Sequence, residues 1–118
     1  MDIQEQFYQA VKNNDVENVK LFLKNKEIDP SEGLNFFIYY ASTNGLLEIT
    51  KLLLKDKRVD PSDYNNCSIL FSYKSKHFDI VNLLWKDQRV KNTLEKDDEQ
   101  LYNYLVKKDK IKYKAESF

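Results

Sequence analysis

The sequence predicts an all-α fold, a solenoid of stacked antiparallel helix pairs that a terminal capping helix closes. Three stretches of the 118-residue chain can be laid over one another at a constant offset of 31 residues, and a period of this size indicates a stacked array. The chain holds only two glycines and two prolines, which favours helices over a loop-rich structure. Aromatic residues make up 14% of the chain and predict an aromatic-rich core.

The second and third copies of the repeat match best, and the first copy follows the same register with no insertion or deletion. The return segment Ile28–Ser31, for example, falls on Val59–Ser62. One domain over residues 1–118 is therefore expected. Its repeats are expected at about residues 2–32, 33–63 and 64–94.

Each repeat is expected to contain two short helices joined by a tight turn. In the second copy, a first helix over residues 34–43 ends before Gly45, because glycine enters the left-handed region without a steric penalty. A second helix over residues 47–55 places apolar side chains on one face and charged ones on the other. The short connection folds the two helices into an antiparallel hairpin.

The turn residue differs between the copies, since Asn14 and Lys76 stand at the position of Gly45. Asparagine tolerates the left-handed conformation, whereas lysine is held there at a cost of about 1 kcal/mol. The register therefore predicts a positive φ at Lys76. After the second helix, an Asp-Pro-Ser segment turns the chain back, because proline disfavours helix at the residue before it.

Stacking has to supply the stability of these helices, because helices this short are marginal in water. The smallest residue of each first helix recurs at one place, at Ala10, Ala41 and Ser72. Around it, apolar residues recur on the first and second helices. We expect a continuous core of Phe7, Ile38, Ile69, Phe22, Leu53 and Leu84.

The pattern breaks at Thr93, and a capping helix over about residues 95–110 is expected after it. Carboxylates stand at its start and lysines at its end, in the order that complements the helix dipole. Leu101, Tyr104 and Leu105 supply an apolar face. The tail over residues 111–118 is expected to pack loosely.

Segment Ala41–Ile49 resembles the Ala-Ala-x-x-Gly-His-x-x-Val stretch of the ankyrin repeat, and His77 stands where the family's histidine follows the glycine. The resemblance covers Phe7 to Val90, although the family's Thr-Pro-Leu-His opening is absent. The 31-residue period resembles a divergent ankyrin type that is common in large DNA viruses of protists and in amoebae. A tetratricopeptide-type array, with longer helices and a period of about 34 residues, fits less well.

Few side chains in the chain suit catalysis or metal binding. Cys67 and His77 could pair as a thiol nucleophile and its base. A histidine at this turn is ordinarily a packing residue, however, and a cysteine at a helix start is most simply a small apolar filler. Glu17, Glu48 and Asp79 repeat at one position on a solvated helix face. We therefore predict no catalytic residue, no metal site and no cofactor, which ranks an enzyme third among the functions.

The composition points away from several partners. The 19 basic and 19 acidic side chains balance to a net charge of zero, which gives no field to attract nucleic acid or an anionic membrane. The first residues lack a secretory pattern, and no apolar run approaches the roughly 20 residues that cross a bilayer. We expect a soluble monomer in the cytoplasm, or in the host cytoplasm if the protein is viral.

The ankyrin resemblance implies a protein-protein interaction module whose inner helices and loop tips line a concave groove. Most aromatic side chains of the first helices are expected in the core or between repeats. A structural or self-assembling array remains the alternative. Carried over by register, the expected residues of the groove for a protein partner are Lys12, Asn13, Glu32, Asn35, Thr43, Asn44, Asp63, Tyr64, Asn66, Lys74 and Ser75.

Overall fold

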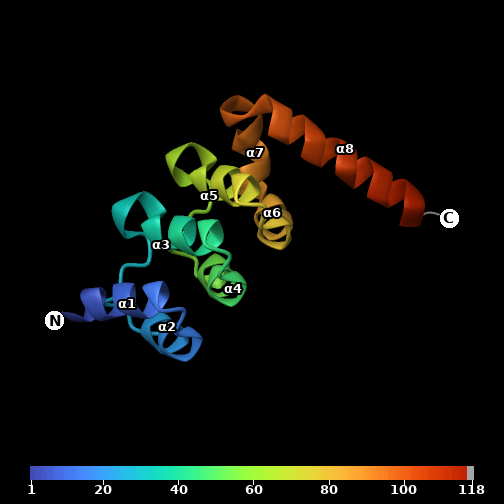
Figure 1. The fold of residues 1–118 in the computed structure, drawn as a ribbon. Coiled ribbons are helices and arrows are strands. Elements are labelled where there is room, and N and C mark those ends of the chain that lie inside the picture. Colours follow the sequence, from blue (N-terminus) through green and yellow to red (C-terminus); the bar gives the residue numbers. More distant parts are fainter. Residues whose placement is uncertain (117–118) are drawn as a thin grey trace.

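The computed structural model describes residues 1–116, which form eight α-helices and no strand, so the all-α prediction is confirmed. Consecutive helices pair as hairpins, and the hairpins stack in a row (Figure 1). In chain order the helices are α1 (Ile3–Lys12), α2 (Val16–Leu23), α3 (Glu32–Thr43), α4 (Leu47–Lys55), α5 (Asp63–Lys74), α6 (Phe78–Trp85), α7 (Gln88–Asp97) and α8 (Glu99–Glu116).

The stack is elongated. Its principal extents are 52 × 29 × 24 Å, and its radius of gyration of 15.1 Å exceeds the roughly 13.5 Å of a compact domain of this length. The inner helices α1, α3 and α5 lie in one row and the outer helices α2, α4 and α6 in another (Figure 1). Contacts therefore run mainly between neighbouring hairpins, as in other solenoids.

The buried core runs along the whole stack, and the expected core residues are fully buried except Phe22, which is half-buried. Phe22 lies on α2, in the first hairpin. The Phe7 ring meets the rings of Phe22 and Phe37 edge to face, with centroids 6.2 and 4.7 Å apart. This aromatic contact ties the first hairpin to the second.

The turns inside the hairpins adopt the left-handed conformation at one repeated position. Asn14, Gly45 and Lys76 have φ values of 54°, 74° and 63°, which confirms the prediction for Lys76. The next backbone N–H then donates to the carbonyl of the small residue in the preceding helix, as from Leu46 to Ala41 at 2.8 Å. The three turns are therefore structurally equivalent although their residues differ.

Substitution of Gly45 by alanine is expected to destabilise the fold by about 1–2 kcal/mol, because the left-handed backbone penalises a Cβ. The new Cβ would also lie 2.8 Å from His77 Cε1, so that the imidazole of the next hairpin has to move. Gly33→Ala is the matched control, since Gly33 also has positive φ but its added Cβ would meet only Phe36 Cβ, at 3.3 Å. Urea denaturation measures both, and equal costs would show that His77 offers no resistance.

The loop tips contain one turn of left-handed backbone that the sequence pattern does not predict. Residues 33–35 have φ values of 67°, 58° and 64°, and residues 64–66 have 54°, 56° and 58°. Right-handed helix begins only at Phe36 and Cys67, two residues later than expected in the second copy. Left-handed conformation costs about 1–2 kcal/mol per non-glycine residue, so other interactions must hold the tips in place.

The cap is a hairpin of α7 and α8 and not the single helix expected over residues 95–110. Helix α7 occupies the place of the third return segment, where Asn92 replaces the proline of the earlier copies and keeps a backbone N–H for helix formation. Asp87 caps α7 by accepting from the N–H of Arg89 at 2.9 Å. The tail expected from residue 111 continues α8 as exposed helix to Glu116, and its last two residues lie outside the described chain.

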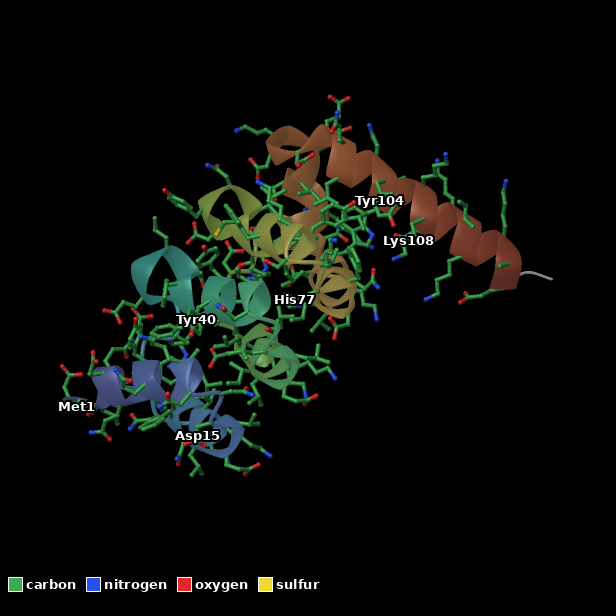
Figure 2. The ribbon with its side chains drawn as sticks, in the orientation of Figure 1. Met1, Asp15, Tyr40, His77, Tyr104 and Lys108 are labelled. Atoms are coloured by element: carbon green, nitrogen blue, oxygen red, sulfur yellow. The ribbon has the colours of Figure 1, made fainter. Side chains whose placement is uncertain are left out.

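Helix α8 packs on the α5–α6 hairpin from Tyr102 to Asp109 and extends beyond it (Figure 1). Leu101 and Leu105 are buried as expected, but Tyr104 is 50% exposed and contacts Tyr73 with ring centroids 6.1 Å apart. The indole N–H of Trp85 donates to Asp109 Oδ2 at 2.7 Å. Figure 2 shows Tyr104 and Lys108 on the part of α8 that lies near the α5–α6 hairpin.

Candidate functional site

Two of the predicted groove residues, Asn35 and Asn66, are buried and connect neighbouring repeats, so their placement on an exposed groove is wrong. The amide of Asn35 donates to Asp63 Oδ2 at 3.0 Å and accepts from the N–H of Asp60 at 2.8 Å. Gln4 occupies the same register in the first copy and bonds in the same way to Glu32 and to both backbone groups of Asp29. These side chains offset the backbone strain of the tips and join one tip to the next.

Asn66 is the third side chain at this repeated position, but its hydrogen-bond partners differ from those of Gln4 and Asn35. Its amide donates to Thr93 Oγ1 at 2.8 Å and to Asp97 Oδ2 at 2.7 Å, both on α7. Its Oδ1 has no hydrogen-bond partner, because the N–H of Lys91, which stands in the register of Asp60, donates to Asp87 within α7 instead. The change from return loop to helix thus leaves one buried acceptor unmatched.

A second inter-repeat contact comes from the Asp-x-Arg segments before the return loops. Arg58 pairs with Asp56 at 2.7 Å and donates to the carbonyls of Leu23 and Ile28 in the preceding repeat. The side-chain hydrogen bond from Arg58 holds the pKa of the Asp56 carboxyl below its usual value. Arg89 repeats the arrangement, pairing with Asp87 and donating to Val59. These arginines are structural and leave little charge free for a ligand.

The other predicted groove residues fall into two separate groups. Glu32, Asp63 and Tyr64 lie at the tips, where the inner helices begin. The second group lies where these helices end, some 15 Å away by the rise of a helix. Its exposed members are Lys12, Asn13, Asn44, Lys74 and Ser75, and Thr43 is half-buried.

An apolar groove of about 470 Å³ extends from the tips along the inner helices α3 and α5, and of the predicted groove residues only Tyr64 lines it. Most aromatic side chains of the first helices were expected in the core or between repeats. Leu34 is 58% exposed, Tyr64 63% and Phe71 40%. The groove is lined by Gly33, Leu34, Phe36, Tyr39, Tyr64, Cys67 and Phe71.

The aromatic lining is ordered by ring contacts. Phe36 contacts Tyr39 with centroids 6.2 Å apart, and Tyr39 meets Phe71 edge to face at 5.8 Å. Lys74 Nζ lies 4.9 Å from the centroid of Phe71, and Lys12 Nζ lies 5.0 Å from that of Tyr8. The side chains therefore form a continuous apolar surface with cations near its far end.

The structure does not bring Cys67 and His77 together. About two turns of α5 follow Cys67 before the turn that holds His77, whose ring lies against Gly45. Burial is the main factor that raises the pKa of the Cys67 thiol, which keeps it protonated at neutral pH. Residues 1–116 contain no cluster of three or more metal-ligating side chains, and none of their helices is long and apolar enough to cross a membrane.

Stacked helix hairpins, the first three of which share a left-handed turn, define a helical repeat protein. A family model of ankyrin repeats, in three copies, matches residues 7–97, so the chain belongs to the ankyrin-repeat family. Ankyrin repeats are generally protein-protein interaction modules and are typically non-enzymatic. Comparisons with curated proteins and with solved structures find no match.

Proposed function

We propose that this chain is an adaptor that binds a protein partner in the groove between α3 and α5. The exposure of Leu34, Tyr64 and Phe71 within one continuous apolar surface carries the proposal. Large apolar side chains rarely stay together in solvent without a binding role, and aromatic residues make strong interface anchors. The exposed residues of the two polar groups, at the tips and at the helix ends, would form the rim.

The remaining features of the proposal rest on charge, on Cys67 and on the repeat period. A net charge of zero and carboxylates at the tips support a protein partner over nucleic acid or an anionic membrane. The protonated, half-buried Cys67 supports a binding role for the groove and not a catalytic one. We propose a monomer that acts in the cytoplasm, where a lone cysteine stays reduced. The 31-residue period supports a place among the divergent ankyrin repeats of protist viruses and amoebae.

Removing the two exposed tip side chains by Leu34→Asn and Tyr64→Asn is expected to abolish capture of the partner from extracts of cells that express the protein. Asparagine tolerates the left-handed backbone at both positions, so the fold should be retained. Affinity capture followed by quantitative mass spectrometry measures the loss. Equal thermal unfolding temperatures would show that the variant is folded.

Leu21→Gln is the matched control, because Leu21 is equally exposed but lies on the outer helix α2. It should leave capture unchanged. If both variants capture the same proteins as the parent chain, the groove is not the binding surface. Light scattering over a concentration series tests the alternative of a self-assembling array, which predicts a mass that grows with concentration.

A further inference from the structure

We infer that the partner presents a linear segment in which an apolar side chain is flanked by lysine or arginine residues. The apolar side chain enters the groove between α3 and α5, and the cations contact carboxylates on either side of it at the tips. This inference rests on the proposed function and specifies the chemistry of the partner. Three observations carry it.

The first observation is that Leu34 and Tyr64 occupy positions where neither burial nor backbone preference favours them. Both are more than half exposed, and both have the left-handed φ values, 58° and 54°, that glycine or asparagine adopts most easily. Strained residues of this kind cluster at binding sites. Because both side chains line the same groove, contact with an apolar ligand group explains their presence.

The second observation is the charge next to the groove. Asp2, Glu5 and Glu32 line the neighbouring hollow between α1 and α3, where no basic side chain of the described chain takes part in the lining. On the other side, Asp63 and Asp97 line a hollow between the tip of α5 and helix α7, together with Asp60 and the single cation Lys96. The apolar groove thus lies between two acidic hollows.

The third observation is that five of the six carboxylates in these hollows have only uncharged hydrogen-bond donors. Asp60 lies 4.0 Å from Arg89 Nε, whereas none of the other five takes part in an ion pair within residues 1–116. They accept instead from amides, namely Asp2 from the N–H of Glu5, Glu5 from Gln9, Glu32 from Gln4, Asp63 from Asn35 and Asp97 from Asn66. Their charge is therefore available to a cationic partner.

The charges at the two ends of the inner helices give the bound segment an orientation. Lys12 and Lys74 stand at the far ends of the inner helices, each over an aromatic ring. A basic segment is repelled there and attracted at the tips, so its cations should lie along the tip edge. A phosphorylated or acidic segment would meet the opposite arrangement and is disfavoured.

Panning a phage library of random dodecapeptides against the full chain tests the inference. Enriched peptides should contain an aromatic or large aliphatic residue with lysine or arginine on both sides. The dissociation constant of synthesised peptides, measured by fluorescence anisotropy, should weaken as ionic strength rises. The double variant Glu5→Gln with Glu32→Gln should weaken it roughly three- to tenfold, the effect of two partly exposed charge pairs.

The matched control is Glu17→Gln with Glu48→Gln, which removes the same charge from exposed positions on the outer helices α2 and α4. It should leave the dissociation constant unchanged. Enriched peptides that are acidic or uncharged, yet lose binding to Leu34→Asn with Tyr64→Asn, would overturn the basic segment and retain the groove. Peptides unaffected by the tip variant, or no enrichment, would overturn both proposals.

A second copy of the chain is another candidate occupant of the groove, because the C-terminal part of α8 carries Ile111 exposed among lysines. Light scattering of the parent chain and of Glu5→Gln with Glu32→Gln separates this case. We expect both to remain at the monomer mass. Oligomers that the double variant abolishes would assign the groove to self-association and overturn a separate basic partner.

Discussion

Leu53→Ala is expected to destabilise the protein by about 2–5 kcal/mol, the cost of an unfilled cavity in a packed core. Leu53 is fully buried in the middle hairpin, where neighbouring hairpins pack on both sides. A domain of this size is stable by only about 5–15 kcal/mol, so the loss is a large share of the total. Urea denaturation followed by circular dichroism measures it.

Leu21→Ala is the control for this substitution, since it removes the same atoms from a side chain that is 61% exposed on α2. Its cost should stay within about 0.5 kcal/mol, as for most surface substitutions. Phe22 stands at the register of Leu53 but is only half-buried. Phe22→Ala should therefore lower the free energy of unfolding by less than the same substitution at a fully buried phenylalanine. Similar losses for Leu53 and Leu21 would contradict the assigned burial.

Asn35→Ala is expected to destabilise the protein by about 2–4 kcal/mol. The substitution removes a hydrogen bond to the charged Asp63 and one from the backbone of Asp60. It also places alanine at a φ of 64°, which adds about 1 kcal/mol of strain. The same denaturation experiment measures the effect.

Asn65→Ala separates the two contributions, because Asn65 has a φ of 56° but is exposed, and no hydrogen bond of its side chain is recorded. Its cost should be the strain alone, about 1 kcal/mol. If Asn35→Ala costs no more than Asn65→Ala, the amide does not hold the repeats together. Asn35→Asp is a further check, since a carboxylate in that place would face Asp63 and lack the donor.

The hairpins and the core could be predicted because their pattern depends on local sequence. Three recurring features fix the register: a small side chain on the first helix, the turn position and the apolar stripe. The positive φ at Lys76 follows from that register alone. The cap was predicted less well. Asn92 stands where the earlier copies have proline, and this replacement permits a helix without favouring one. Helix α7 was therefore not predicted.

The left-handed tips and the amides that hold them could not be foreseen from propensity. Three consecutive residues in this conformation are unfavourable alone and persist through contacts with residues that lie 25 to 31 positions away. The recurrence of Gln4, Asn35 and Asn66 at the repeat period was a visible signal. From the sequence alone, an amide in a loop is expected to be solvated, which explains the wrong placement of Asn35 and Asn66.

The apolar lining of the groove, apart from Tyr64, was missed because most aromatic residues of the first helices were assigned to the core or to contacts between repeats. Phe36, Phe37, Ile38, Tyr39 and Tyr40 are consecutive, so they surround the helix on all sides. A hairpin in a two-layer stack buries mainly one face of its inner helix, and the residues on the other face must remain in contact with solvent. The excess of aromatic residues over buried positions was therefore the signal for the groove.

Trp85 makes the docking of the cap visible to fluorescence. It is the only tryptophan of the chain, is nearly buried, and contacts the cap through Tyr102, Asp109 and Lys91. Its emission therefore reports whether α8 is docked, whereas circular dichroism reports all helices together. Coincident transitions would mean that array and cap unfold as one cooperative unit, and a separate early change in emission would mean that the cap detaches first.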